Sequence, residues 1–419
     1  GCGNVWKFPW MCGQNGGGGF MLVYLACLVL LGLPAIVMEF AIGRASQASP
    51  VFMYRKLEKP GHKWGIFGIV CLIGNIALMA FYTVVTGWII YYFVKFLTGQ
   101  NDSFGFEAMI TNPGVNVTFL LVTVVAAFAI LSFNLQGGLE RVTKYMMVSL
   151  LILMMVLAIH GLTLSGAKEG LKFYLVPDFS KIDGSVVVSA MNQAFFTLSV
   201  GQGSMEIFAS YMDKKNSLGG EAVRITALDT FVALLAGLII FPACFAYGVE
   251  PDQGPSLIFV TLPNIFINMP MGQIWGGLFF VFMTFASFST VTAVFEALIG
   301  NCMDNFGWGR KKAVYILLPL VFFGSIPCVL GFNMWSDVQI LGSKGILDTE
   351  DFIVSNLVLP IGSLIFALFC VSKYGWGFDH YLKEVNTGDG MKIPRWLKPY
   401  FQIVLPLLIM VIAARSLLG

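Results

Sequence analysis

The segment FFTLSVGQGSMEIF, Phe195 to Phe208, breaks a long apolar stretch with small and polar residues. Ser199, Gly201 and Gly203 fall near its middle. Every backbone N–H and C=O group inside a bilayer needs a partner, so such a cluster predicts non-helical backbone that lines a cavity rather than lipid. The opening residues GCGN, Gly1 to Asn4, form a second cluster of this kind. We therefore expect two interrupted helices.

The composition is that of a polytopic membrane protein. The chain has 419 residues, of which 57% are hydrophobic and 11% charged, and its mean hydropathy is +0.80. Windows of roughly 20 apolar residues, long enough to cross a bilayer, are expected near Phe20–Ile42, Trp64–Leu97, Val115–Phe133, Val142–Leu164, Gly184–Met212, Thr226–Tyr247, Gly272–Cys302, Ala313–Phe332, Phe352–Val371 and Phe401–Leu418. The short opening segment, Gly1 to Met11, brings the expected total to eleven spans, and we expect the other half of its helix to precede Gly1.

The basic residues predict the orientation of the chain. The loops between spans 2–3, 4–5, 6–7, 8–9 and 10–11, with the adjoining span ends, hold 18 of the 25 lysines and arginines, and the other side holds 7. By the positive-inside rule these even-numbered loops are cytoplasmic, in a multi-pass protein of the cell membrane. Topology accounts for the net charge of +2, which gives no indication of a nucleic-acid partner.

The two breaks fall at corresponding places, in span one and in span six. Spans one to five (about 1–166) and six to ten (about 184–373) then form matching halves of a single membrane domain, with span eleven (about 396–418) left over. An interrupted helix at the start of each half is typical of an inverted-repeat transporter with a site at mid-membrane. Free carbonyls suit a cation and helix N-termini suit an anion, so a zwitterionic amino acid with sodium fits. The alternative is a pair of kinks tolerated by close helix packing.

Several longer motifs resemble one family over nearly the whole length. They are GNVWKFPW and NGGGGF near the start, MEFAIGR around Glu39, AFYTVVTGW around Tyr82, QGGLERVTKYMM at residues 136–147, FFTLSVGQG in span six and FASFSTVTAVFE in span eight. Together they are similar to the neurotransmitter:sodium symporter family, in its bacterial branch. The resemblance implies an all-α LeuT-type fold, with a 5+5 inverted repeat, discontinuous helices one and six, and an eleventh helix.

The resemblance also implies sodium ligands, in one or two sites. Asn4, Thr197 and Asp229 match the first site, where oxygen ligands suit a hard cation. Chloride-dependent members balance the charge with an anion; here Asp229 supplies a negative charge and Ala233 stands where those members carry serine, so chloride is not expected to be required. The second sodium site is matched by Ala286, Ser289 and Thr290.

For the substrate, Tyr82 matches the tyrosine that holds the amino-acid carboxylate, beside the backbone of Gly3, and Phe196 matches an aromatic lid. The remaining implied contacts are Leu78, Thr197, Ser199, Gln202, Thr290 and Val294. Most of this lining is apolar, which favours a hydrophobic or aromatic amino acid. Gln202 departs from the family pattern, in which a bulky apolar residue is common, and it either hydrogen-bonds a polar ring substituent or turns away.

The resemblance further implies two gates. Lys7 and Asp351 match the ion pair on the outer side, with lysine in place of the usual arginine, and Gln193 is expected to contact them. On the inner side Asp304, Ser210 and Tyr211 are expected to take part in closure. Glu39 is interpreted as a structural acceptor that ties span two to the unwound segments, whereas Glu206 and Glu296 are expected to face an inner vestibule.

Sodium-coupled uptake has three alternatives. A channel or sensor on the same scaffold fits less well, because paired gates alternate closure. An enzyme is not expected, since no nucleophile lies beside a base and no metal-ligand cluster or phosphate loop is present in the sequence. A proton-coupled relative, with Glu206 or Glu296 as the carrier, stays open. The partners expected are a small amino acid and membrane lipids.

Overall fold

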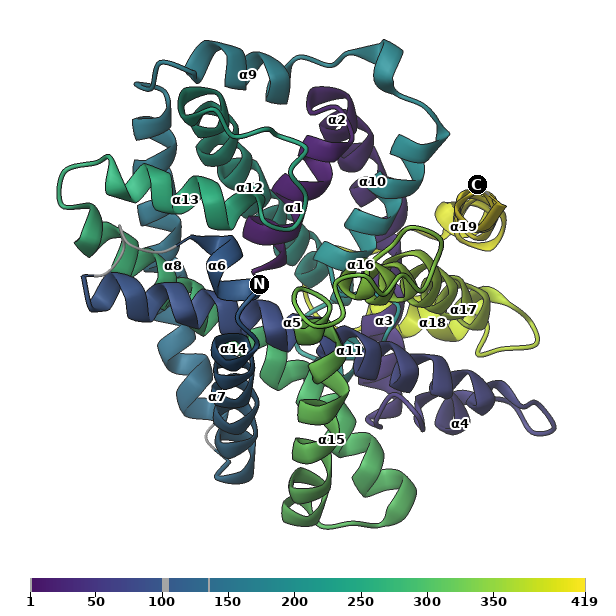
Figure 1. Cartoon of the computed structure of the whole chain (residues 1–419). Coiled ribbons are helices and arrows are strands. Elements are labelled where there is room, and N and C mark those ends of the chain that lie inside the picture. Colours follow the sequence, from purple (N-terminus) through teal and green to yellow (C-terminus); the bar gives the residue numbers. More distant parts are fainter. Residues whose placement is uncertain (1, 100–104, 135, 419) are drawn as a thin grey trace.

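The computed structural model describes residues 2–99, 105–134 and 136–418. The described part is helical, and only isolated bridges, with no β-strand, are assigned within it. Nine of its helical segments are long and apolar enough to cross a membrane: Gly18–Ser46, Trp64–Leu97, Pro113–Ser132, Glu140–Gly161, Leu218–Tyr247, Gly272–Phe306, Arg310–Leu330, Ile346–Val371 and Arg395–Leu418. The all-α transmembrane class is confirmed (Figure 1).

The individual helices subdivide some of these segments. The α-helices are α1 (Gly3–Gln14), α2 (Gly18–Cys27), α3 (Leu33–Ser46), α4 (Met53–Leu57), α5 (Gly68–Leu97), α6 (Phe106–Ile110), α7 (Pro113–Ser132), α8 (Gln136–Gly161), α9 (Ala167–Leu175), α10 (Gly184–Thr197), α11 (Ser204–Ala209), α12 (Leu218–Tyr247), α13 (Leu257–Ile267), α14 (Gly272–Phe306), α15 (Arg310–Leu330), α16 (Ile346–Phe352), α17 (Leu359–Val371), α18 (Phe378–Val385) and α19 (Leu405–Leu418). π-helical turns join them at η1 (Leu28–Gly32), η4 (Ile353–Val358) and η6 (Tyr400–Val404).

The two expected spans outside that set of nine are the predicted broken ones. Span one is represented by α1, whose first residues lie in the middle of the molecule (Figure 1). Span six is split into α10 and α11, and residues 198–203 between them are not helical. Ser199, Gly201 and Gly203 take positive φ values of 54°, 100° and 80°. Glycine adopts such values without strain, and two glycines here therefore account for the break. Gly1 of the other predicted break lies outside the described residues.

Glu39 of α3 holds the unwound segment of span six. One carboxylate oxygen accepts a hydrogen bond from the Gly201 N–H (2.9 Å), and the other accepts from the N–H groups of Met205 and Glu206 (both 3.1 Å). These backbone groups lack helical partners because the helix stops and restarts, so a buried carboxylate supplies the acceptors. The predicted structural role of Glu39 is confirmed.

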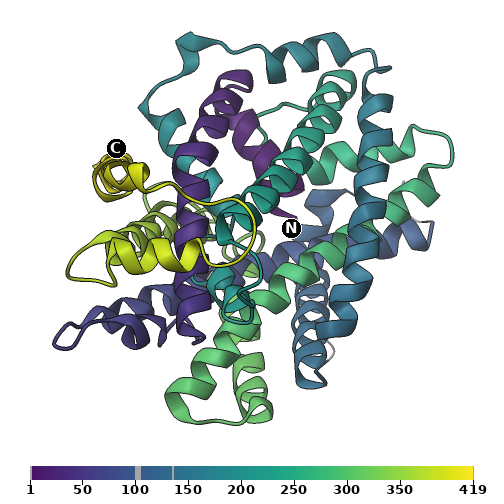
Figure 2. The same cartoon turned by 180° about the vertical axis from the view of Figure 1, so that it is seen from behind.

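Packing places the broken helices inside a shell of unbroken ones. α1 contacts α10, α12 and α13, and α5 packs against α14. α10 contacts α2, whereas α11 contacts α3, so both pieces of span six lie along one continuous helix. The last helix, α19, packs on α17 and α10 and lies at the margin of the molecule in both views (Figures 1 and 2).

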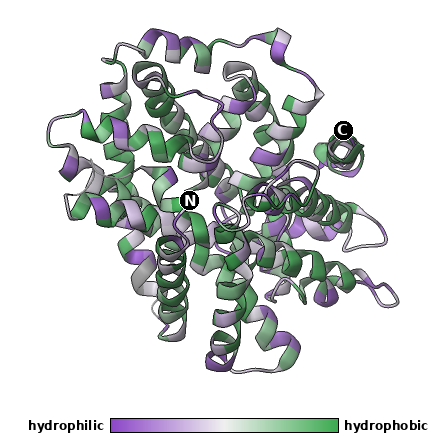
Figure 3. Cartoon of the chain, viewed as in Figure 1, coloured by the Kyte–Doolittle hydropathy of each residue, from purple (hydrophilic) through white to green (hydrophobic). Residues whose placement is uncertain are grey.

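The long helices consist mainly of hydrophobic residues, as Figure 3 shows. On α5 the side chains of Ile69, Ile73 and Ile76 are each more than half exposed, and they recur at intervals of four and three residues. This spacing puts them on one helix face. A large exposed apolar face on a helix of 30 residues fits contact with lipid hydrocarbon.

The even-numbered loops gather on one face of the molecule. Lys59, between spans two and three, donates a hydrogen bond to the carbonyl of Lys373, between spans ten and eleven (2.7 Å). Lys214, between spans six and seven, pairs with Glu384 of α18 (3.4 Å). Residues at the 4–5 and 8–9 connections line one cavity. We call this side the basic face and the other side the opposite face.

Candidate functional site

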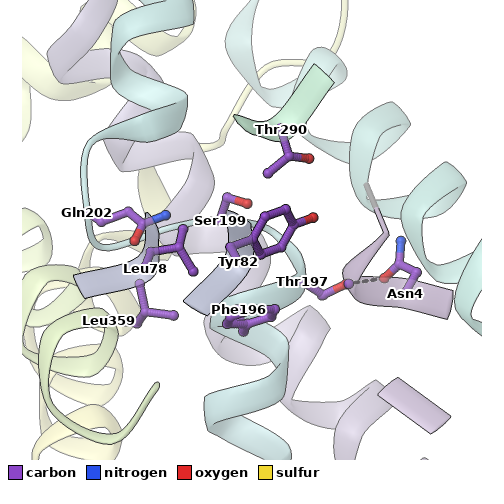
Figure 4. Close-up of a pocket in the computed structure, with 10 residues that line it drawn as sticks. Asn4, Leu78, Tyr82, Phe196, Thr197, Ser199, Gln202, Thr290 and Leu359 are labelled. Atoms are coloured by element: carbon purple, nitrogen blue, oxygen red, sulfur yellow. Dashed lines mark hydrogen bonds between the residues drawn. The ribbon is translucent and has the colours of Figure 1, made fainter. Parts of the chain in front are cut away.

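A small cavity lies where the broken helices meet. Its walls come from α1, α5, α10, the unwound segment of span six, α14 and the start of α17 (Figure 4). The lining residues are Gly3, Asn4, Leu78, Tyr82, Phe196, Thr197, Ser199, Gln202, Thr290 and Leu359. The cavity volume is about 30 Å³, enough for about two to three water molecules at about 10–15 Å³ each. The lining side chains therefore leave little free space in the site.

Three oxygen-bearing side chains meet at one end of this cavity. Thr197 donates to the side-chain oxygen of Asn4 and lies 2.8 Å from Oδ2 of Asp229. The amide of Asn4 donates to Oδ1 of Asp229 at 2.6 Å. The structure thus brings together the three residues expected at the first sodium site. A carboxylate, an amide oxygen and a hydroxyl are the ligand types that suit a hard cation, so this donor set fits sodium.

The residues expected at the second sodium site share one stretch of α14. Ala286, Ser289 and Thr290 fall within five residues of each other. Thr290 lines the small cavity, whereas Ser289 is exposed on the wall of a larger cavity on the basic face. The two hydroxyls therefore lie at the boundary between the small cavity and the larger cavity on the basic face.

Tyr82 projects into the middle of the small cavity (Figure 4). Its hydroxyl accepts a hydrogen bond from the thiol of Cys2 (2.9 Å), a contact that the sequence did not predict. Phe196 packs on Gly3, where an added Cβ would lie 3.2 Å from the ring. Glycine at this position is explained by that close approach.

Two lining positions differ from the prediction. Val294 is 1% exposed and is not among the lining residues, although Thr290, one helical turn before it, is. Leu359 takes a lining position instead, at the first residue of α17 directly after a π-helical turn. A π-turn inserts an extra residue into the helix and rotates everything that follows, so the sequence period alone does not show which side chain faces inward.

Lys7 forms a polar cluster beside Phe196, one of the residues that line the cavity. Its ammonium group forms an ion pair with Asp351 and donates to Ser355 Oγ (2.6 Å). Ser355 also donates to Asp351 (2.9 Å). The same ammonium lies 3.8 Å from the ring centroid of Phe196, within cation–π range. We call Lys7, Asp351 and Ser355 the opposite-face latch.

Gln193 does not join this latch. Within the described chain its two amide atoms are buried and have no hydrogen-bond partner, so the expected contact is not seen. Ser355, which the sequence did not single out, takes the polar role instead. Its position four residues after Asp351 on the same helical run was the available signal, because residues at that spacing lie on one face.

The basic face carries a cavity of about 760 Å³. Glu296 and Arg310 lie on its wall and form two parallel hydrogen bonds of 2.6 and 2.8 Å. Bidentate pairing of this kind is the geometry that arginine favours with a carboxylate. The prediction that Glu296 faces an inner vestibule agrees with this position, but its arginine partner was missed.

A neighbouring cavity of about 320 Å³ includes Asp304, Ser210 and Tyr211 in its lining, so the structure brings these three expected gate residues together. Asp304 accepts a weak hydrogen bond from the Ser49 N–H (3.3 Å). Glu206, by contrast, was wrongly expected in a vestibule. It is 0% exposed beside Ser46, because α11 packs against α3 and turns this side chain inward.

Comparisons with known proteins agree with this arrangement. The model of the sodium:neurotransmitter symporter family matches residues 1–103 and 100–418. A sodium-dependent transporter of Bacillus subtilis is 35% identical over 93% of this chain and 87% of its own length. A sodium-dependent transporter of Haemophilus influenzae is 34% identical over 100% of this chain and 94% of its own.

A solved structure shows the same architecture. The crystal structure of MhsT in complex with L-phenylalanine superposes with a TM-score of 0.93 at 36% sequence identity. The match covers 99% of this chain and 95% of the other. The overall helical arrangement is therefore shared with a protein whose structure was solved in complex with an amino acid.

Proposed function

This chain belongs to the sodium:neurotransmitter symporter family, and we propose that it carries hydrophobic or aromatic amino acids into the cell with sodium and without a requirement for chloride. The family is one of transporters rather than enzymes, and the fold is the LeuT type, with a 5+5 inverted repeat and an eleventh helix. Sodium-coupled symport follows from this membership. The substrate class, the independence from chloride and the residue roles are the proposal.

The observation that carries the proposal is the cluster of Asn4, Thr197 and Asp229 beside the small cavity. A carboxylate within a membrane span is costly unless a cation balances it. A sodium ion held by these oxygens would balance Asp229 and lie next to an amino-acid carboxylate bound near Tyr82. In this role Asp229 would supply the negative charge that an anion supplies elsewhere, and Ala233 offers no side-chain hydroxyl for chloride.

The remaining assignments complete the mechanism. Ala286, Ser289 and Thr290 would hold a second sodium ion. The opposite-face latch and the residues of the basic face, Asp304, Ser210 and Tyr211 among them, would open in turn, which is alternating access. The even-numbered loops would be cytoplasmic by the positive-inside rule. The two repeats would span about 1–166 and 184–373, with about 396–418 as the eleventh helix.

Uptake into proteoliposomes tests the proposal. With an inward sodium gradient, amino acid should accumulate above its external concentration, and replacing chloride by gluconate should leave uptake unchanged. Asp229→Ala should reduce sodium-stimulated binding by tenfold or more, since it removes the charged ligand. Thr230→Ala is the matched control, because among the described residues that hydroxyl bonds only back to the carbonyl of Thr226 (2.7 Å). Entry of amino acid that does not depend on the sodium gradient would contradict the proposal.

A proton-coupled form is the second candidate. It is favoured by one observation, that Glu206 is buried within the membrane and one of its carboxylate oxygens has no hydrogen-bond partner among the described residues. Uptake that persists without sodium and follows a pH gradient would support this form. Loss of that uptake in a Glu206→Gln protein would identify the carrier.

A further inference from the structure

Gln202 lies at the end of the small cavity farthest from the sodium-ligand cluster. Figure 4 shows it with Leu78 and Leu359 on one side of Tyr82, and Asn4 with Thr197 on the other. Gln202 is 2% exposed and lines the cavity. An amino acid whose charged groups lie near Tyr82 and Asn4 would therefore direct its side chain toward Gln202.

A buried hydrogen-bond network fixes which way the Gln202 amide points. Asn75 of α5 donates through Nδ2 to the backbone carbonyl of Gln202 (3.1 Å), so its Oδ1 must be an acceptor. Ser204 Oγ lies 3.2 Å from that Oδ1 and donates its proton there. The serine oxygen can then only accept from Gln202, whose Nε2 lies 3.1 Å away. Asn75 and Ser204 are 0% and 2% exposed, which holds the network in place.

This network leaves Oε1 of Gln202 as an acceptor with no donor. Within the described residues that atom is buried and has no hydrogen-bond partner. Buried polar atoms are normally satisfied, and an acceptor without a donor is destabilising. Because Gln202 lines the cavity, a bound molecule can provide the missing donor.

We propose that Gln202 selects amino acids whose side chain is largely apolar and ends in a hydrogen-bond donor, namely the phenol O–H of tyrosine or the indole N–H of tryptophan. The inference rests on the proposed function and deepens it. Leu78, Leu359 and Phe196 give the walls an apolar character that suits an aromatic ring. A carboxylate side chain would place acceptor against acceptor and is excluded.

Selection through such a group can be strong. A site built to hydrogen-bond a donor rejects the isostere that lacks it, because the site's own polar atom is then left unpaired. The cavity of about 30 Å³ has to widen to admit a ring. We expect the amide to keep its orientation when the cavity widens, since its Nε2 bonds Ser204 of α11, and Asn75 of α5 holds Ser204 in turn.

The experiment compares sodium-dependent binding of L-tyrosine, L-tryptophan, L-phenylalanine and 4-fluoro-L-phenylalanine to the purified full chain. We expect at least one of the two donor-bearing amino acids to bind about tenfold or more tightly than the two that lack a donor. Gln202→Leu should abolish that preference by weakening binding of the donor-bearing amino acids relative to phenylalanine, and a melting temperature close to that of the unaltered chain would show that the variant is folded. Ser204→Ala should weaken the preference, because the amide is then free to turn, without loss of phenylalanine binding.

Equal binding of all four compounds to the unaltered chain would overturn the inference, since water would then satisfy Gln202 as well as a substrate does. A preference that survives Gln202→Leu would overturn it too. The 4-fluoro compound tests the donor in the unaltered chain, so the result does not depend on a variant. Binding of none of the four with sodium would overturn this inference and the aromatic part of the proposed function, whereas sodium-dependent binding without a donor preference would overturn this inference alone.

Discussion

The ion pairs on the two faces of the molecule are built differently. On the opposite face a single ammonium group, Lys7, meets Asp351, and the two side chains are 1% and 13% exposed. On the basic face Arg310 and Glu296 form a bidentate pair, and their side chains are 29% and 17% exposed beside a large cavity. The less directional pair is the more enclosed one. We therefore expect burial, rather than the number of hydrogen bonds, to set how much each pair contributes to stability.

The largest effect is expected where the enclosed pair loses its anion. Asp351→Asn leaves the Lys7 ammonium buried without its counter-charge, and breaking a buried pair in this way costs about 3–5 kcal/mol. We expect a clearly lower melting temperature and uptake reduced by about tenfold or more, measured in detergent and in proteoliposomes. Asp348→Asn, an exposed position on the same helix, is the control. Equal melting temperatures for the two variants would show that burial of the Lys7–Asp351 pair does not increase its contribution to stability.

A smaller effect is expected on the basic face. Glu296→Gln removes one partner of a pair that water can reach, and such pairs contribute about 1 kcal/mol or less. The melting temperature should fall only slightly, and uptake should fall less than in Asp351→Asn. The same two assays check this. If Glu296→Gln proved the more damaging variant, the proposed ranking of the two faces would be reversed.

The smallest effect is expected from Lys7→Arg, which gives both faces an arginine–carboxylate pair. A guanidinium can form two parallel hydrogen bonds to Asp351, so the latch should open less readily. We expect an unchanged or slightly higher melting temperature and an initial uptake rate lowered by about threefold or less. Faster uptake in this variant would contradict the idea that the pair limits opening.

Much of the fold could be predicted because the membrane imposes simple rules. The apolar windows located the spans, and Gly201 with Gly203 located the break in span six, since unpaired backbone is tolerated there only beside a cavity or a protein partner. Boundaries were less certain. The span that begins at Arg310 starts three residues before the predicted Ala313, because basic residues at its end belong to the helix although they lie outside the apolar window.

The candidate site could be predicted mainly where the family resemblance supplies a matching position. Asn4, Tyr82, Thr197 and Asp229 come together as the resemblance implied. Leu359 was missed because a π-turn rotates its helix, and the Arg310 partner of Glu296 was missed because the pairing crosses a loop. Such contacts depend on how helices are rotated and placed against each other, which the spacing of residues along one helix does not determine.

The carboxylate of Glu39 has a mechanical consequence for any opening of the molecule. It binds the Gly201, Met205 and Glu206 N–H groups from a helix that runs without interruption past both pieces of span six. α11 cannot swing away from α3 unless several hydrogen bonds to one side chain break at once. The unwound segment of span six is thus held in place by Glu39 and is not a free hinge. We expect α11 and α3 to move together as one rigid body.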